Sequence, residues 1–314
     1  MPVIHYGASA RTVLGMRDRF MGVATTTAAP SDPSWPGWDL DEAAADYWAA
    51  EFTTAVAGVL TAAEAARLAA AYLASEPPQD QDAQTAAAWL TAQGFDLAPA
   101  LAAPAAGVVA DGFLIGAASA TAVANGTPAD VGAWQPGDTD AAQAQAEALG
   151  AGAAYTAAQK TAAQVAAAAA ASFALAMAAA LTAGAGATAA VIAAALRAAV
   201  RDAGHAAAIV LDHITAACGA AANAMYKLLG ISLAFWMAKH DTRVCDVCAA
   251  NAASESLPIG AAYPSGDITP PAHPHCRCAL MPEGANRPDA TGRLREYLLN
   301  ERTSADSLLE ALNA

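Results

Sequence analysis

Apolar residues recur every three or four positions along most of the chain, which is the spacing of helices that bury one face. Asp39, with Glu42 three residues later, has the spacing of a cap at the start of the first helix, and Thr61 with Glu64 repeats it. The apolar ladders comprise Tyr47, Trp48, Phe52 and Val56, then Val165, Phe173, Met177 and Leu181, then Ile192, Leu196 and Val200. We therefore predict a mainly α fold built of long helices.

Prolines, glycines and polar runs divide this pattern into five parts. We predict an N-terminal arm (1–38), a helical lobe (39–104), a body of long Ala-rich helices (105–230), a small irregular Cys/His subdomain (231–283) and amphipathic tail helices (284–314). Pro99 and Pro104 are expected to bound the connection between lobe and body, so that the next helix begins near Gly107. Loose alternation from Ile231 to Met237 favours a short strand or β-hairpin in the Cys/His subdomain.

One part of the body has no charge. No Asp, Glu, Lys or Arg occurs between Thr161 and Leu196, a length that would span a membrane. The stretch is mostly alanine, is interrupted at Gly184-Ala185-Gly186, and has few of the Leu, Ile and Phe residues that drive insertion. We expect two buried helices joined at a glycine hinge, and a membrane span is the alternative.

The composition and the net charge indicate how the helices pack and which partners the chain can bind. Apolar residues make up 56% of the chain but aromatic residues only 6%, so alanine supplies much of the core and the helices must pack closely to bury enough area. The net charge is −14, with only 15 Lys and Arg residues. Binding to nucleic-acid phosphates depends on clustered Lys and Arg, so we expect no specific nucleic-acid binding.

Four of the five cysteines and two of the six histidines lie between Lys239 and Leu280. Cys245 and Cys248 form a C-x2-C pair, and after the loop 249–272 the chain reads His-Pro-His-Cys-Arg-Cys. Two close sets of ligands separated by a loop are typical of a tetrahedral metal site, and thiolate with imidazole favours Zn²⁺. More candidate ligands are present than the four places require, which favours a closed, structural zinc site over a catalytic one.

The candidate metal ligands are Cys245, Cys248, His273, Cys276 and Cys278. The first three are the firmest, while Cys276 and Cys278 compete for one place because alternate residues of an extended segment point the same way. His275 is expected to face solvent, and Cys218 to be a small buried residue. Two disulfides or metal-free thiols are the alternatives. The first 20 residues lack a basic and then apolar leader, so we expect synthesis in a reducing cytoplasm.

A family resemblance is based on the same region. Its residues are Trp236, Asp241, Arg243-Val244-Cys245, Cys248, Tyr263-Pro264, Gly266, Pro270-Pro271, His273-Pro274 and Cys276-Arg277-Cys278. This order resembles the C-terminal signature of the phage head morphogenesis family, the Mu F-like minor capsid proteins of tailed bacteriophages. Trp134-Gln-Pro136-Gly137-Asp138 is similar to actinophage members. Relatives commonly have a Thr-Glu pair on the helix before the first cysteine, where this chain has Leu211-Asp212-His213.

The resemblance implies a structural component of the virion, at or near the portal vertex, that acts in head assembly, DNA packaging or ejection. It implies the portal protein and/or the major capsid protein as partners, with several copies in the capsid interior or at the portal vertex after assembly in the host cytoplasm. A membrane-active protein ejected with the genome is the alternative.

The sequence contains no evident catalytic constellation. It has no nucleotide-binding loop and no G-x-S-x-G motif, so we do not expect an enzyme. A zinc-dependent enzyme, a further alternative, would need an open metal position and an acid, for which the loop offers Glu255 and Asp267.

Overall fold

The computed structural model describes residues 35, 37–75, 83–126, 136–148, 150–183, 188–200, 203–239 and 244–283. Its elements are α2 (Gly37–Val59), α3 (Ala62–Ala74), α4 (Ala83–Ala92), α5 (Ala98–Asn125), α6 (Thr139–Ala148), α7 (Gly152–Ala183), α8 (Ala189–Ala199), α9 (Ala203–Leu228), β1 (Leu233–Met237), α10 (Asp246–Ala253), β2 (Leu257–Pro258) and β3 (Ala279–Pro282). The predicted mainly α class is confirmed. The predicted tail, nearly all of the predicted arm and the glycine hinge lie outside the described residues.

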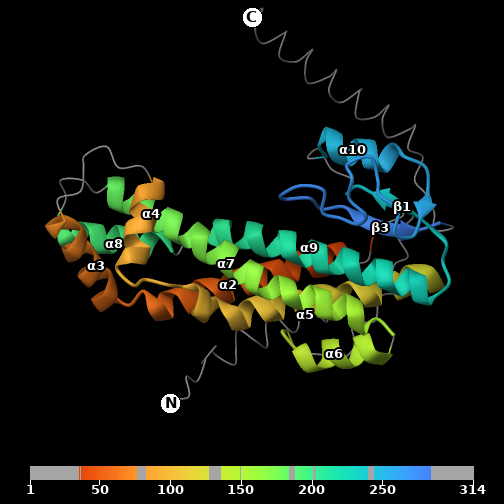
Figure 1. Ribbon diagram of the computed structural model, residues 1–314, viewed down its shortest axis with the longest axis horizontal. Coiled ribbons are helices and arrows are strands. Elements are labelled where there is room, and N and C mark those ends of the chain that lie inside the picture. Colours follow the sequence, from red (N-terminus) through yellow and green to blue (C-terminus); the bar gives the residue numbers. More distant parts are fainter. Residues whose placement is uncertain are drawn as a thin grey trace, which may run out of the picture.

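The long helices α2, α5, α7 and α9 lie side by side along the long axis of the molecule (Figure 1). The short helices α3, α4 and α8 pack at one end of this bundle, and α6 lies against α5 and α7. The three strands and α10 lie at the other end, on α9. The bundle is therefore the platform on which the Cys/His subdomain rests.

The two predicted caps have different outcomes. Thr61 caps α3 as predicted, because its side chain accepts the Glu64 N–H at 3.2 Å. The prediction for Asp39 is wrong, since α2 already begins at Gly37 and Asp39 lies in its first turn. The Trp38 N–H bonds the Trp35 carbonyl at 3.2 Å, and an added Cβ on Gly37 would lie 2.4 Å from Trp35 Nε1. Glycine thus lets the Trp35 ring cover the start of the helix.

The predicted break between lobe and body is also wrong. Helix α5 begins at Ala98, whose N–H bonds the Asp96 carboxylate at 2.9 Å, and continues through Pro104. Pro99 is tolerated because it lies in the first turn, where the N–H groups have no helical partner. Pro104 does remove a helical hydrogen bond, but it is buried, and α2, α7 and α9 pack along the same helix. Tertiary packing outweighs the local preference of this proline.

Helices α5 and α9 approach one another backbone to backbone. A Cβ on Gly116 would lie 2.5 Å from the Cys218 carbonyl oxygen and 2.6 Å from its Cα. A Cβ on Gly112 would lie 2.8 Å from the Ile214 carbonyl oxygen. Neither contact could relax by moving a flexible side chain, so this crossing requires glycine.

We expect Gly116→Ala to destabilise the protein by about 1–3 kcal/mol or more, because the methyl group must push two helix backbones apart. Gly58→Ala is the matched control, since Gly58 lies on α2 with nothing within 4 Å of the added Cβ. That control should be neutral or should stabilise by up to about 1 kcal/mol. Urea unfolding followed by circular dichroism measures both, and equal stability of the two variants would contradict the close crossing.

The bundle buries two carboxyl groups. Asp111 on α5 is 0% exposed and accepts the Trp48 Nε1–H at 2.7 Å and the Gly137 N–H at 2.8 Å. Asp41 on α2 accepts the Cys218 thiol at 3.0 Å, so Cys218 is buried, as predicted, and is also a hydrogen-bond donor. Burial raises the pKa of Asp41 and of Asp111 to about 7.

These raised pKa values predict a pH-dependent stability. Between about pH 4 and pH 7 the folded protein keeps the Asp41 proton that the unfolded chain has released, so the free energy of unfolding should fall as the pH rises through this window. In Asp41→Asn the decrease in the free energy of unfolding over this window should be smaller by up to about 4 kcal/mol. The part of the decrease that comes from Asp111 should remain. Urea titrations from pH 4.5 to 7.5 test this, with Asp46→Asn on an exposed position of α2 as the control. An unchanged slope in Asp41→Asn would contradict it.

By length and composition, α5, α7 and residues 208–228 of α9 could each cross a bilayer, and the bent pair α2 and α3 would make a fourth span. The bundle covers 72% of the apolar window of α5 but only 39% of that of α7. The predicted ladders at Phe173 and Met177 on α7 and at Leu196 on α8 are buried, whereas Leu175 is 45% exposed. Helix α7 therefore buries one face, and after the exposed Lys160 its other face carries no charge.

Candidate metal centre

A three-stranded antiparallel sheet holds the Cys/His subdomain together. Strand β1 lies in the middle, with β2 and β3 on its two sides, where the sequence had predicted only a strand or hairpin. All but the first residue of β1 are buried, which explains its weak apolar and polar alternation. Trp236 pairs with Leu280 and Met237 with Ala279, so the register brings the end of the Cys/His loop beside β1.

The first ligand pair lies at the start of α10. Cys245 is the N-cap residue, and its sulfur accepts the Cys248 N–H at 3.5 Å. The turn places both sulfurs on one side, with Cys248 buried and Cys245 partly buried. Asn251, one turn later, fixes α10 to the following loop: its amide donates to Ser265 Oγ at 2.9 Å and its carbonyl accepts the Ser265 N–H at 3.0 Å.

The second pair lies in a tight turn. The Cys276 N–H bonds the His273 carbonyl at 3.2 Å, and His275 between them adopts a left-handed conformation with φ 63°. The N–H of His275 donates to the Asp212 carboxylate on α9. The His273 ring places Nδ1 2.7 Å from the Pro274 carbonyl oxygen. A ring held in this way directs Nε2 toward a metal, as is usual for metal-bound histidines.

The structure brings all five predicted ligands together. His273 Nε2 lies 3.0 Å from the sulfurs of both Cys245 and Cys248, and the Cys248 and Cys276 sulfurs are 3.7 Å apart. Two groups of three have ligand atoms within 4.8 Å of one another: Cys245, Cys248 and His273, and Cys248, Cys276 and Cys278. The cluster can therefore hold a metal ion. His275 is exposed, as predicted, and belongs to neither group.

The buried thiols of the cluster shift one another's pKa. The S–H groups of Cys248 and Cys278 lie beside the Cys276 sulfur and lower the pKa of Cys276, while the same contact raises the pKa of Cys248. A lowered pKa favours the thiolate, which is the form that binds metal. Glu255 and Asp267, which a zinc enzyme would need, belong to neither ligand group.

Several contacts fix the cluster to the bundle. Tyr226 on α9 donates its hydroxyl to the Leu280 carbonyl at 2.9 Å, and Lys239 after β1 pairs with Glu42 on α2. A Cβ on Gly219 would lie 2.6 Å from the Pro270 carbonyl oxygen, so glycine lets the loop lie against α9. The sheet and its loop thus pack directly on α9 and α2.

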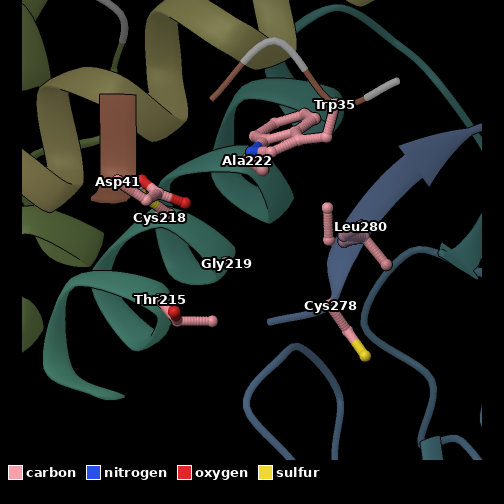
Figure 2. A pocket seen from close by; sticks show the side chains of 9 residues that line it. Trp35, Asp41, Thr215, Cys218, Gly219, Ala222, Cys278 and Leu280 are labelled. Carbon is pink, nitrogen blue, oxygen red and sulfur yellow. Dashed lines mark hydrogen bonds between the residues drawn. The ribbon is translucent and has the colours of Figure 1, made fainter. Parts of the chain in front are cut away.

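A small cavity of about 10 Å³ lies at this junction (Figure 2). It is lined by Trp35, Asp41, Thr215, Cys218, Gly219, Ala222, Cys278, Ala279 and Leu280. A second cavity of the same size lies on the metal side and is lined by Lys239, Val244, Cys248, His273, His275, Cys276, Arg277 and Cys278. Each has room for about one water molecule. Cys278 lines both and therefore lies between the cluster and the bundle.

Sequence inspection missed the residues that support the cluster. Asp212 lies in the segment where this chain departs from the signature that it resembles, and that departure was its only indication. Tyr226 and Asn251 carry no local signal, because their partners lie 54 and 14 residues away. Their roles depend on how α9 and α10 pack.

None of the family models matches this chain, and no curated protein or solved structure matches it either. The function proposed below therefore rests on the site and on the resemblance of its residues to the phage head morphogenesis signature.

Asp212 offers a test of this support. Asp212→Ala should lower the affinity for added Zn²⁺ by about 10- to 100-fold, because the His275 N–H that shapes the second ligand turn loses its acceptor. Asp212→Asn keeps a carbonyl oxygen at the same place and should retain most of the affinity. Competition with a chromophoric chelator measures both variants. Equal affinity of Asp212→Ala and the wild-type protein would contradict this role.

Proposed function

We propose that this protein is a structural, non-enzymatic minor capsid protein of a tailed bacteriophage, whose C-terminal subdomain is held by a structural Zn²⁺. The main support is that the cysteines and His273 of the segment resembling the head morphogenesis signature lie in one cluster. Their ligand atoms form two groups that share Cys248, which are Cys245, Cys248 and His273, and Cys248, Cys276 and Cys278. Trp236 and Tyr263 of the same signature pack edge to face at 5.2 Å beneath them.

Zinc fits the chemistry of these ligands. Sulfur and imidazole nitrogen are its preferred donors, and a site with four protein ligands leaves no place for a substrate. The subdomain also needs such a bond, because its three strands have only five, two and four residues. So small a sheet buries little apolar area, and metal binding would supply much of its folding free energy.

The bundle suits a protein partner. The bundle is long, the exposed face of α7 is uncharged after Lys160, and the chain carries a net charge of −14. An acidic surface repels DNA, so a protein beside packaged or passing DNA would not bind it. The portal protein and/or the major capsid protein are the partners we propose, with several copies in the virion, in the capsid interior or at the portal vertex.

The metal content of the purified protein is the first test. Elemental mass spectrometry should find about one zinc per chain, and chelation should free the thiols and make residues 231–283 sensitive to protease. Protein prepared in zinc-supplemented medium that contains no metal, and whose thiols all titrate without chelation, would exclude the structural zinc.

The role in the head needs a separate test. A Cys245→Ser/Cys248→Ser double variant should unfold the subdomain and be lost from phage heads, because it removes one of the two ligand pairs. Cys218→Ser is the matched control: it changes a cysteine of the bundle and keeps a donor for Asp41. Quantitative mass spectrometry of purified heads measures incorporation. Normal incorporation of the double variant would refute the proposed role of the zinc subdomain in assembly.

A second candidate is a membrane-active protein ejected with the genome. The exposed face of α7, which is uncharged after Lys160, favours it, since only 39% of the apolar window of this helix is covered. Flotation with anionic vesicles tests it, and Leu175→Glu places a charge on that exposed face without touching the bundle core. Flotation of the wild-type protein, reduced in Leu175→Glu, would support this candidate, whereas no flotation would remove it.

A further inference from the structure

The five candidate ligands exceed the four places of a tetrahedral zinc, and the structure distinguishes among them. This inference rests on the proposed zinc site. The chain presents two turns of the same size, in which Cys245 and Cys248, and then His273 and Cys276, stand three residues apart. Each turn is closed by its own hydrogen bond, from the Cys248 N–H to the Cys245 sulfur and from the Cys276 N–H to the His273 carbonyl. Each turn therefore carries two candidate ligands.

The distances favour Cys276 as the fourth ligand. Two sulfurs that each lie about 2.3 Å from a tetrahedral zinc are about 3.8 Å apart. The Cys248 and Cys276 sulfurs are 3.7 Å apart. His273 Nε2 is 3.0 Å from the Cys245 and Cys248 sulfurs, close to the roughly 3.6 Å that a shared zinc would give. Cys276 thus lies at the sulfur–sulfur distance of two ligands that share an ion, and metal binding would draw it closer to Cys245 and His273, with which it forms no group within 4.8 Å.

Cys278 has a different environment. It lies after the second turn, and the next residue, Ala279, is paired with Met237 in the sheet, so the sheet fixes its backbone. Its side chain lies between the metal-side cavity and the bundle cavity. The indole Nε1–H of Trp236, on the neighbouring strand, is buried and has no hydrogen-bond partner among the described residues. The sheet, rather than the second turn, therefore places Cys278.

We propose that Cys245, Cys248, His273 and Cys276 bind the zinc, and that Cys278, placed by the sheet, stays outside the coordination sphere. Three thiolates and one neutral imidazole give a complex with one net negative charge. Lys239 and Arg277 line the same cavity and can balance that charge. The fifth cysteine then joins the zinc subdomain to the bundle rather than holding the ion.

Cys276→Ser and Cys278→Ser are a matched pair for the test, since both replace a buried cysteine with the same residue. Each full-length variant is loaded with Co²⁺, whose sulfur-to-metal charge-transfer absorption scales with the number of thiolate ligands. We expect Cys278→Ser to keep the wild-type absorption and one zinc per chain. Cys276→Ser should lose about one third of that absorption and bind zinc more weakly. The reverse pattern, or a loss in both variants, would overturn the proposal.

A folding failure of Cys276→Ser would not leave the proposal undecided, because Cys276→His supplies a substitute zinc ligand at the same place. This variant should retain one metal per chain and lose about one third of the charge-transfer absorption. An unchanged absorption would show that Cys276 is not a ligand. Failure of the proposed zinc site itself looks different, since the wild-type protein would then bind neither Zn²⁺ nor Co²⁺.

Discussion

The backbone-to-backbone crossing of α5 and α9 is the contact on which the rest of the structure depends. Gly112 and Gly116 leave no space for a side chain there, so the two helices meet at the smallest separation that the chain allows. The opposite side of α9 carries Asp212, Gly219 and Tyr226, which contact the Cys/His loop and β3. Helix α9 thus contacts both the bundle core and the ligand cluster, and it fixes the position of one relative to the other.

An alanine-rich core is stabilised by the close packing of its helices rather than by the burial of large side chains. Alanine buries little area, so dispersion contacts between closely packed helices must supply what Leu and Phe would supply elsewhere. The few large side chains occupy the crossings, where Trp48 packs on Gly107 and Phe113 meets Tyr155 edge to face at 5.1 Å. Two buried carboxyl groups are compatible with this core because each has a hydrogen-bond donor.

The Cys/His subdomain is stabilised in a different way from the bundle. Its sheet is too small to be stable alone, and the buried residues of β1 and β3 share one apolar core with the bundle. A metal at the cluster would fix the two ligand turns relative to one another, while the bundle fixes them relative to α9. The two restraints are complementary, which is consistent with a rigid structural part rather than with a site that opens to a substrate.

The sequence determined the class of the fold and the composition of the candidate site, because helical periodicity and ligand spacing are local properties. It predicted the Thr61 cap, the strand after Ile231 and the five candidate ligands from neighbouring residues alone. The predictions from the sequence were wrong where a helix end or a helix interior depends on residues far away in the chain. Pro104 lies inside a helix because three other helices pack along α5, and Asp39 is not a cap because Trp35 extends α2 by two residues. Only the tertiary structure gave Cys276 and Cys278 different backbone surroundings, since both are buried cysteines two residues apart. Cys276 ends the turn closed at His273, whereas Cys278 precedes Ala279, which pairs in the sheet with Met237, 42 residues earlier in the chain.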